Sequence, residues 1–500
     1  MTRPILIAGG RVLDPEGELH QPPAMDVLIE AGRITALGDA ATARASAVAA
    51  ETIDAAGHLI TPGFVNAHSH SHDVLLRGLF EQEPLEVWGL SAFPSAWPRR
   101  PVEEIALRTQ LHAAECLRGG ITTLQDMVTI VGPDEEHAAA IVDVYGRAGL
   151  RCVLAIQFAD LGLADAVPFL DEVLPAEQVA AFKRASDPAP MQRYVETLIT
   201  NVSAARLTWG LGPSAPQRCS EALLGWTARL SQERGLPLFT HVYETRTQAV
   251  HARIVHGGSL LDVMQKTGLL NPRTVIAHGV WMAPDEIDRL GAAGVQLACN
   301  PVTNLKLLNG AAPVKRYAQG GVRTGLGCDN SSGNDTQNIF QSMKLFALWW
   351  ALQSEAGETG AAAQAFRAAT IGGADAVRLG GHVGRVKEGY RADLLLFDLA
   401  DPVWKPFNSA VRQLVYGETG RALRTVLVDG EVVVQGGRLL TVDEPAMNTR
   451  IDAVQEVVRR DLAVIAERSA PLAAALRGVH ERAKAVPLEI DPLRLAPVGA

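Results

Sequence analysis

Cysteine is scarce in this sequence, and the five that occur are odd in number and widely scattered along the 500 residues. Such a set does not make a disulfide framework, and it favours a cytoplasmic protein. No run rich in lysine and arginine is present either, and the formal net charge is −9. That balance argues against nucleic acid as a partner.

Long hydrophobic runs are missing as well. The longest apolar stretch, near residues 345–352, is far shorter than a membrane span, and the opening MTRPILIAGGRVLD lacks the pattern of a signal peptide. We therefore expect no membrane partner. Apolar residues make up 47% of the chain and charged residues 20%, which predicts a large buried core and excludes global disorder.

Histidine is uncommon, 13 in 500 residues, yet three occur at every second position in GFVNAHSHSHDVLLR, residues 63–77. The apolar run before them predicts a short buried strand with a kink near its start, at Pro62 and Gly63. In an extended chain, residues i and i+2 point to the same side, so His68 and His70 aim two nitrogens at one point. An isolated pair of this kind is a weak signal, which gains weight only if further ligands follow.

The middle of the chain alternates between strand and helix signals. Helical periods, such as the one that stops at Gly119 and Gly120, separate the strand segments. Eight strands alternating with helices predict an α/β fold, a (β/α)8 TIM barrel, whose chemistry lies at the carboxyl ends of the strands. The eight strand candidates are residues 65–67, 121–126, 151–157, 206–212, 236–241, 273–279, 294–300 and 322–329.

The two flanks of the chain have a different texture. Residues 1–60 carry short β-rich runs separated by glycine and aspartate, which predict a small antiparallel sheet. Similar runs return in residues 385–440 as ADLLLFDL, LVYGE and TVLVDGEVVVQGGRLL. We expect both flanks to combine into one small β-sandwich domain beside a barrel of residues 61–384.

Residues 441–500 are expected to form a C-terminal helical extension. Apolar side chains there follow helical spacing, which predicts a long amphipathic helix that packs on the barrel or on a neighbouring subunit. The residues that carry this pattern are Ile451, Val454, Val458, Leu462 and Ile465.

Polar residues end four of the strand candidates. His68 and His70 end the first, His241 the fifth, His278 the sixth and Asp329 the eighth. A lone histidine in such a place is as often a hydrogen-bonded core residue, and an aspartate before Asn-Ser-Ser is common in turns. Four coincidences at one end of a barrel instead favour a metal site of the zinc or ferrous iron type, which accepts nitrogen and oxygen ligands.

Several longer motifs occur in a specific order between about residues 60 and 400: TPGFVNAHSH with LLRGL, HVYET, AHGVW, NPVTNLKLLNGAAPV, GLGCDNSSGND and EGYRADLLLFD. The set resembles the amidohydrolase superfamily, in the branch of cytosine, guanine and adenosylhomocysteine deaminases and triazine hydrolases. The resemblance implies a barrel that carries a β-sandwich built from both flanks, and a homodimer or homotetramer.

The resemblance also implies roles for individual residues. His68, His70, His241 and Asp329 become the metal ligands. Glu244 and His278 become acid–base and polarising groups, and Asp329 shares in the catalysis. His72 matches no ligand position and is expected to line the pocket mouth or to support the ligands.

One departure bears on the number of metal ions. Relatives with two metals bridge them by a carboxylated lysine at the end of the fourth strand, but RLTWGLGPSAPQRCS contains no lysine. The third strand ends in Gln157, which offers no bridge. We therefore expect one divalent ion, Zn²⁺ or Fe²⁺.

The expected function is that of a metal-dependent aminohydrolase that removes an amino group from a nitrogen heterocycle of purine, pterin, pyrimidine or triazine type. A divalent metal activates water near neutral pH, Asp329 takes the water proton and Glu244 protonates a ring nitrogen. His278 hydrogen-bonds the attacking water or the developing charge. The alternative is a hydrolase of the same fold that removes chloride or an alkylamine from a triazine-like ring, or opens a cyclic amide. A third hypothesis, a non-catalytic barrel that serves as an assembly partner, would be favoured by loss of Glu244 or a ligand, and none is lost.

Substrate contacts are harder to derive. Trp88 lies in an aromatic loop that either stacks on a flat ring or packs on itself. Amide side chains of Gln157, Gln217 and Asn304 are candidates to bind ring edges, and Trp281 is a candidate to wall the site. The segment GPSAPQRCS departs from the patterns of adenosylhomocysteine and guanine deaminases, so neither substrate is assigned.

Overall fold

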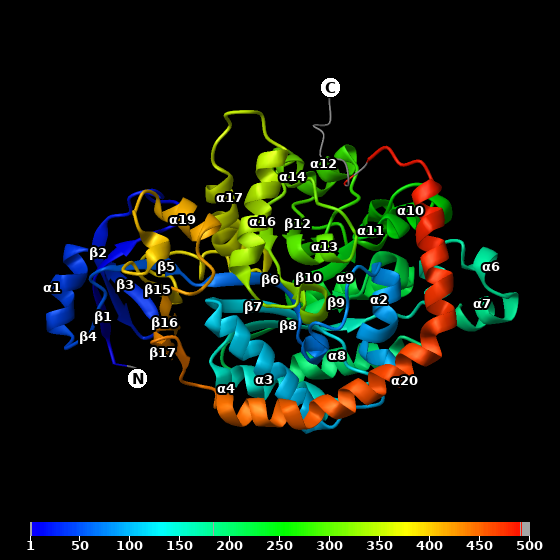
Figure 1. Ribbon diagram of the computed structural model, residues 1–500, viewed down its shortest axis with the longest axis horizontal. Coiled ribbons are helices and arrows are strands. Elements are labelled where there is room, and N and C mark those ends of the chain that lie inside the picture. Colours follow the sequence, from blue (N-terminus) through cyan, green and yellow to red (C-terminus); the bar gives the residue numbers. More distant parts are fainter. Residues whose placement is uncertain (1–2, 184, 491, 493–500) are drawn as a thin grey trace.

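A closed parallel barrel forms the middle of the molecule (Figure 1). The computed structural model describes residues 3–183, 185–490 and 492. The barrel strands are β6 (Phe64–His70), β7 (Ile121–Val128), β8 (Arg151–Phe158), β9 (Leu207–Pro213), β10 (Leu238–Val242), β11 (Thr274–His278), β12 (Gln296–Cys299), β13 (Thr324–Leu326) and β14 (Asp329–Asn330).

The ring closes because its eighth strand comes in two consecutive pieces. The sheet order is β13-β12-β11-β10-β9-β8-β7-β6-β14, so β13 pairs with β12 while β14 pairs with β6. All of these pairings are parallel. The (β/α)8 barrel predicted from the alternating pattern is therefore confirmed.

Helices connect the strands and cover the outside of the barrel. The helix α9 shows how its sequence sets both ends: Ser220 accepts a hydrogen bond from the amide of Leu223, and the helix ends at Gly235, whose φ is +67°. The connecting helices are α3 (Val102–Arg118), α4 (Glu135–Ala148), α8 (Ala189–Asn201), α9 (Glu221–Arg234), α11 (Leu260–Thr267), α12 (Pro284–Ala292), α14 (Val314–Gln319), α16 (Ile339–Leu352), α17 (Ala361–Arg367), η4 (Ala368–Gly372) and α18 (Gly373–Ala376).

Shorter helices belong to the loops that follow the strands. They are η1 (Ser71–Leu76), α2 (Leu85–Ala92), η2 (Pro94–Ala96), α5 (Leu163–Ala166), α6 (Leu170–Val173), α7 (Ala176–Phe182), η3 (Pro216–Arg218), α10 (Arg246–Val255), α13 (Pro301–Lys306) and α15 (Ser331–Asn334).

A second sheet combines strands from both flanks of the chain, which lie side by side at one end of the molecule (Figure 1). Its order is β18-β17-β16-β15-β5-β1-β2-β3, and β4 also pairs with β1. Its strands are β1 (Ile5–Val12), β2 (Ala24–Glu30), β3 (Arg33–Leu37), β4 (Glu51–Asp54), β5 (His58–Pro62), β15 (Leu394–Asp398), β16 (Leu423–Val428), β17 (Glu431–Gln435) and β18 (Arg438–Leu439).

Two expectations for this sheet were wrong. It is mixed rather than antiparallel, because helix α1 (Asp39–Ala47) carries the chain back so that β4 and β5 run parallel to β1. The run LVYGE is not a strand, since its first residues lie in helix α19 (Ala410–Tyr416), which follows η5 (Pro402–Trp404). Ser409 caps α19, and the buried residues of this helix recur with helical spacing.

The strand predicted before the histidines also divides. β5 ends at Pro62 in the small sheet, and β6 begins at Phe64 in the barrel. Gly63 joins them where the backbone passes so close to Thr122 that a Cβ would lie 2.1 Å from its Oγ1. Only glycine fits there, so this residue sets the step from one sheet into the other.

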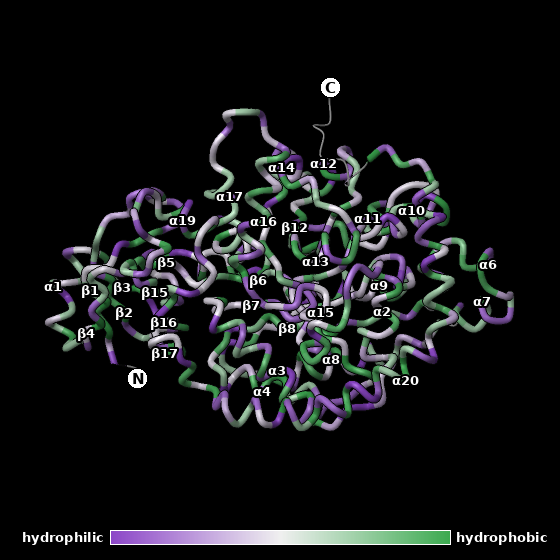
Figure 2. The backbone as a smooth tube through the Cα atoms, viewed as in Figure 1, coloured by the Kyte–Doolittle hydropathy of each residue, from purple (hydrophilic) through white to green (hydrophobic). Residues whose placement is uncertain are grey.

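The helix α20 (Glu444–Ala485) runs along the outside of the barrel (Figure 1). Hydrophilic and hydrophobic residues both occur along its length (Figure 2). Val458 and Ile465 are buried in one cluster with Trp88 and Trp97, so the predicted amphipathic helix packs on the loop that carries these tryptophans. Across the described residues, no helix has the length and apolarity needed to cross a bilayer.

Candidate metal centre

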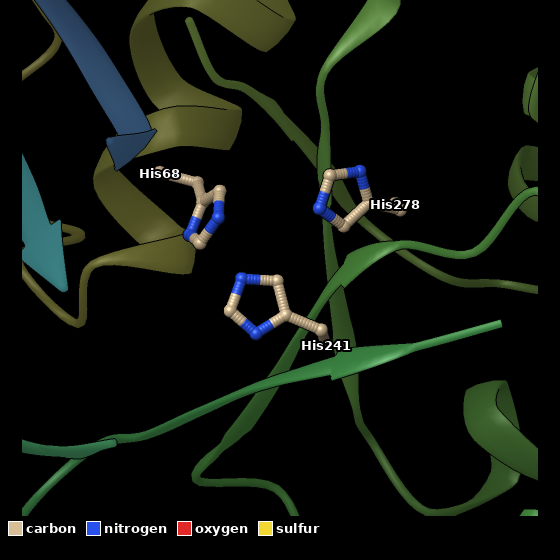
Figure 3. A group of neighbouring side chains, drawn as sticks. All are labelled: His68, His241 and His278. Carbon is tan, nitrogen blue, oxygen red and sulfur yellow. The ribbon is translucent and has the colours of Figure 1, made fainter. Parts of the chain in front are cut away.

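Three imidazoles and one carboxylate converge at the carboxyl ends of the barrel strands. His68 and His70 end β6, and their Nε2 atoms lie 3.1 Å apart. The Nε2 of His241, from β10, lies 3.4 Å from that of His70. Asp329 Oδ1 lies 3.5 Å from His68 Nε2 and 3.4 Å from His70 Nε2. Figure 3 shows His68, His241 and His278 around one common space.

The outer nitrogen of each ring is held by an oxygen. His68 Nδ1 lies 3.2 Å from Oε1 of Gln125, while His70 Nδ1 and His241 Nδ1 lie 2.5 and 2.6 Å from main-chain oxygens of Met127 and Ser214. An Nδ1–H that donates to oxygen leaves the lone pair on Nε2, which faces the centre.

This donor set fits a divalent cation. Nitrogen lone pairs this close repel one another unless a positive charge lies between them. In addition, Asp329 Oδ1 is buried and has no hydrogen-bond partner among the described residues. His68, His70 and Asp329 are close enough to ligate a single ion.

Protonation favours the same arrangement. Burial lowers the pKa of His70 well below its usual value and that of His241 to about 3, so both rings stay neutral. Burial by itself raises the pKa of Asp329, but the adjacent imidazoles of His68 and His278 hold it below the usual range. Neutral imidazoles and an ionised carboxylate are the forms that bind metal.

Backbone strain is concentrated at this centre. His278 and Asp329 have φ of +74° and +62°, in the left-handed region that non-glycine residues rarely occupy. Asn66 of β6 holds the strained eighth strand by accepting from the amide of Cys328 at 3.0 Å and donating to Gln337 at 2.9 Å. Gln337 in turn donates to the main-chain oxygen of Asp329 at 2.8 Å.

Glu244 lies next to the donor set, in the turn after β10. Its Oε1 accepts a hydrogen bond from Asn309 at 3.0 Å, and its Oε2 is 3.5 Å from His278 Nε2. His278 Nε2 is also 3.8 Å from Asp329 Oδ2, so the imidazole lies between the two carboxylates. Burial raises the pKa of Glu244 to about 7, against the opposing charge of His278. A carboxyl group that titrates near neutrality is suited to proton transfer.

A cavity of about 280 Å³ opens beside these groups. Trp88, Gln157 and Gln217 all line it, together with His70, His241, Glu244, His278 and Asp329. Gln157 is oriented by Thr129 and Ser214 at 2.9 Å each, and the indole nitrogen of Trp88 donates to Ser332 at 3.0 Å. The structure thus brings three of the five expected substrate contacts into the lining of one cavity.

The other two expected contacts do not line the cavity. Trp281 is buried behind it, because its indole nitrogen donates to the Asn309 main chain at 2.7 Å and its ring lies under the guanidinium of Arg246. Asn304 faces His278, with 2.8 Å between Oδ1 and Nδ1, and orients that ring. His72 does not line the mouth either; it is buried, and its Nδ1 accepts from the Thr129 amide at 3.3 Å.

Sequence reasoning missed several residues of the site. Gln125, Asn66 and Asn309 orient functional side chains, while Glu86 and Arg218 line the cavity. Asn66 lies within the NAHSH motif, which was a usable signal. Asn309 lies within the NPVTNLKLLNGAAPV motif, although its contact with Glu244 was not foreseen. Gln125, Glu86 and Arg218 carry no such signal, because their roles arise only when distant loops meet.

Fold and donor set together define a metal-dependent hydrolase of the barrel type. The chain belongs to the amidohydrolase family, whose signature matches residues 59–433. It is 32% identical over 433 residues to a 5-methylthioadenosine/S-adenosylhomocysteine deaminase of Thermococcus onnurineus, a match that covers 86% of this chain and 94% of that protein.

Solved structures show the same fold. An adenosine deaminase from Xanthomonas campestris with bound zinc superimposes with a TM-score of 0.77 at 24% identity, over 91% of this chain and 98% of that one. A zinc complex of atrazine chlorohydrolase from Arthrobacter aurescens gives a TM-score of 0.79 at 23% identity, over 90% and 100% of the two chains.

Proposed function

We propose that this protein is a deaminase that hydrolyses an exocyclic C–NH₂ bond on a nitrogen heterocycle. The observation that carries the proposal is the position of Glu244, whose carboxyl lies 3.5 Å from His278 in the cavity wall and whose pKa is raised to about 7. A buried acid beside a metal-type donor set is what protonation of a ring nitrogen requires. The deaminase names of relatives at about one-third identity support the same reaction.

In this proposal His68, His70, His241 and Asp329 hold one divalent ion, with zinc preferred over ferrous iron. Such an ion lowers the pKa of coordinated water from about 15.7 to about 7. The carbonyl of Ser214, next to the end of β9, accepts from His241 and offers no bridging carboxylate, which supports a single ion. The zinc in the two fold neighbours supports the choice of metal.

The side chains divide the proton transfers between them. Asp329 accepts the proton of the attacking water, and Glu244 donates its proton to the ring nitrogen next to the attacked carbon. His278 Nε2, between the two carboxylates, stabilises the charge that develops there. The proton held by Asp329 then passes to the departing amine, which leaves as ammonia as the C–N bond breaks. The hydroxyl proton of the carbon under attack returns to Glu244, so the product is a ring carbonyl and the acid is regenerated. Gln157 and Gln217 bind ring edges, and Trp88 stacks beside the ring.

A screen for ammonia release tests the proposal. The zinc-loaded protein is incubated with aminopurines and their nucleosides, aminopterins, cytosine and aminotriazines, with the Glu244→Gln protein as a blank. We expect ammonia from at least one class, dependent on metal and on Glu244. Release of chloride or an alkylamine from a triazine, or ring opening of a cyclic amide, without ammonia from any member, would establish the alternative hydrolase instead.

Two further expectations remain predictions. The family resemblance suggests a homodimer or homotetramer, which light scattering of the purified protein measures directly. The cysteine content favours a cytoplasmic enzyme, which fractionation of the native cells tests.

A further inference from the structure

Arg218 is a half-buried cation in the cavity wall. It ends η3, the short helical turn after β9, and its guanidinium carbon lies 5.8 Å from the centre of the Phe93 ring. Its Nε is buried and, within the described part of the chain, has no hydrogen-bond partner. No carboxylate among those residues contributes to its pKa, which burial lowers.

The fully buried arginines in the described part of the chain all have counter-charges, whereas Arg218 is half-buried. Arg100 and Arg108 pair with Glu104, and Arg151 pairs with Asp393 and with Asp429. A ligand that fills the cavity would remove the remaining water from this guanidinium, which is costly without a counter-charge. Arg218 is therefore expected to have a counter-charge when the site is in use, and the cavity that it faces is where a ligand enters.

The chemistry of the wall indicates which anion fits. A guanidinium is a planar fork of donors that matches the two oxygens of a carboxylate. Glu86, Glu244 and Asp329 also line the cavity, so a dianionic phosphate would be repelled more strongly than a singly charged carboxylate. Glu86 cannot neutralise Arg218, since it forms no ion pair with it and one of its oxygens accepts from Thr245 at 2.9 Å.

An anion bound to Arg218 would lie apart from the atoms that react. Glu244, His278 and Asp329 follow β10, β11 and the eighth strand, whereas Arg218 follows β9 and contacts Phe93 in the loop after β6. Gln217, adjacent to Arg218 in the chain, also faces the cavity. A ring whose edge binds Gln217 can therefore extend a substituent toward Arg218.

We propose that the natural substrate carries a carboxylate on a substituent of the heterocycle, and that Arg218 binds this carboxylate. The inference rests on the deaminase function proposed above and narrows its substrate class to acidic heterocycles. Arg218 acts in binding and selectivity, and takes no part in the proton transfers.

Matched pairs of compounds test this assignment. Each pair shares one amino-heterocycle and differs only in whether the substituent ends in a carboxylate or in its neutral amide. One example is a pterin that carries either a carboxyl or a carboxamide group. For the ring that releases ammonia, the wild-type kcat/KM is expected to favour the acid over the amide by about 30-fold or more. In Arg218→Met that preference is expected to fall to near unity, mainly through KM for the acid, and Arg218→Lys is expected to restore part of it.

A structural role of Arg218 beside Phe93 predicts a different result, because it would lower turnover of both members alike. Arg234→Met removes an exposed positive charge from the end of α9, one that forms no ion pair with any described residue, and is the control for net charge. Equal preference for acid and amide in the wild type would overturn the proposal. Preference for a phosphate-bearing member over the carboxylate would overturn it in favour of a phosphorylated substrate.

Calorimetric binding of the same pairs to the zinc-loaded Glu244→Gln protein separates this proposal from the reaction itself. Tighter binding of the acid that is lost in the Glu244→Gln/Arg218→Met double variant supports the carboxylate site even if no compound releases ammonia. Ammonia release without any difference in binding between acid and amide would leave the deaminase standing and reject the role of Arg218.

Discussion

His278 and Asn304 face each other across 2.8 Å, with Nδ1 of the ring against Oδ1 of the amide. The amide oxygen accepts from Nδ1 and so turns Nε2 toward Glu244 and Asp329. Asn304→Leu removes the acceptor that orients the ring and is expected to lower kcat by about 10- to 100-fold while metal content stays the same. Steady-state kinetics and metal analysis of one protein batch check both. Loss of metal together with activity would show that His278 is itself a ligand.

Removal of a proposed ligand is expected to act on metal and activity together. His68→Ala and Asp329→Ala each delete a donor from the centre and should leave the protein with little bound metal and no turnover. Elemental analysis after dialysis against a chelator is the measurement. Retention of a full metal complement by either variant would contradict the ligand assignment.

Glu244→Gln is expected to separate binding from chemistry. The amide keeps the shape of the side chain and the contact with Asn309 but cannot donate a carboxyl proton. Metal content should match the wild type, and kcat should fall by at least 10²-fold, a typical contribution of acid–base catalysis. Near-normal turnover would mean that another group supplies the proton.

The pKa of Glu244 predicts the direction of a pH effect. Burial raises it to about 7, so the protonated form that acts as the acid persists up to neutrality and is lost above it. The value of kcat/KM is expected to decline tenfold per pH unit on the alkaline side of about 7. The hydrogen bond from Asn309 lowers this pKa, so Asn309→Leu should move the decline to higher pH. A shift toward lower pH would assign the alkaline limb to another group.

Two adjacent residues of α20 offer a matched test of its packing. Ile465 is 2% exposed, and Val464 is 59% exposed. Ile465→Ala leaves a hole in the buried cluster that includes Trp88 and should lower the free energy of unfolding by about 2–5 kcal/mol. Val464→Ala should change it by less than about 0.5 kcal/mol. Thermal or denaturant unfolding of both variants decides whether α20 stabilises the cavity wall.

Local pattern was enough for the barrel and the candidate ligands. Alternating apolar runs located all eight barrel strands, and period-two spacing put His68 and His70 on one side of β6. Local pattern was insufficient where a short apolar run is compatible with both a strand and a helix. LVYGE is apolar enough for a strand, yet Ser409 and helical burial make it the end of α19. Trp281 follows the strained turn at His278, and Asn304 reaches His278 from α13; neither placement has a signature in the local sequence.

The eighth strand gives the barrel a particular relation between folding and cofactor uptake. β14 pairs Asp329 with Ser69 and Asn330 with His70. The last strand of the barrel therefore pairs directly with the first strand, which carries His68 and His70. A nascent chain still on the ribosome exposes His68 and His70 long before Asp329 is synthesised. In the proposed metal site, high-affinity binding therefore requires closure of the barrel, and a chain cut short before the eighth strand is expected to be both open and metal-poor.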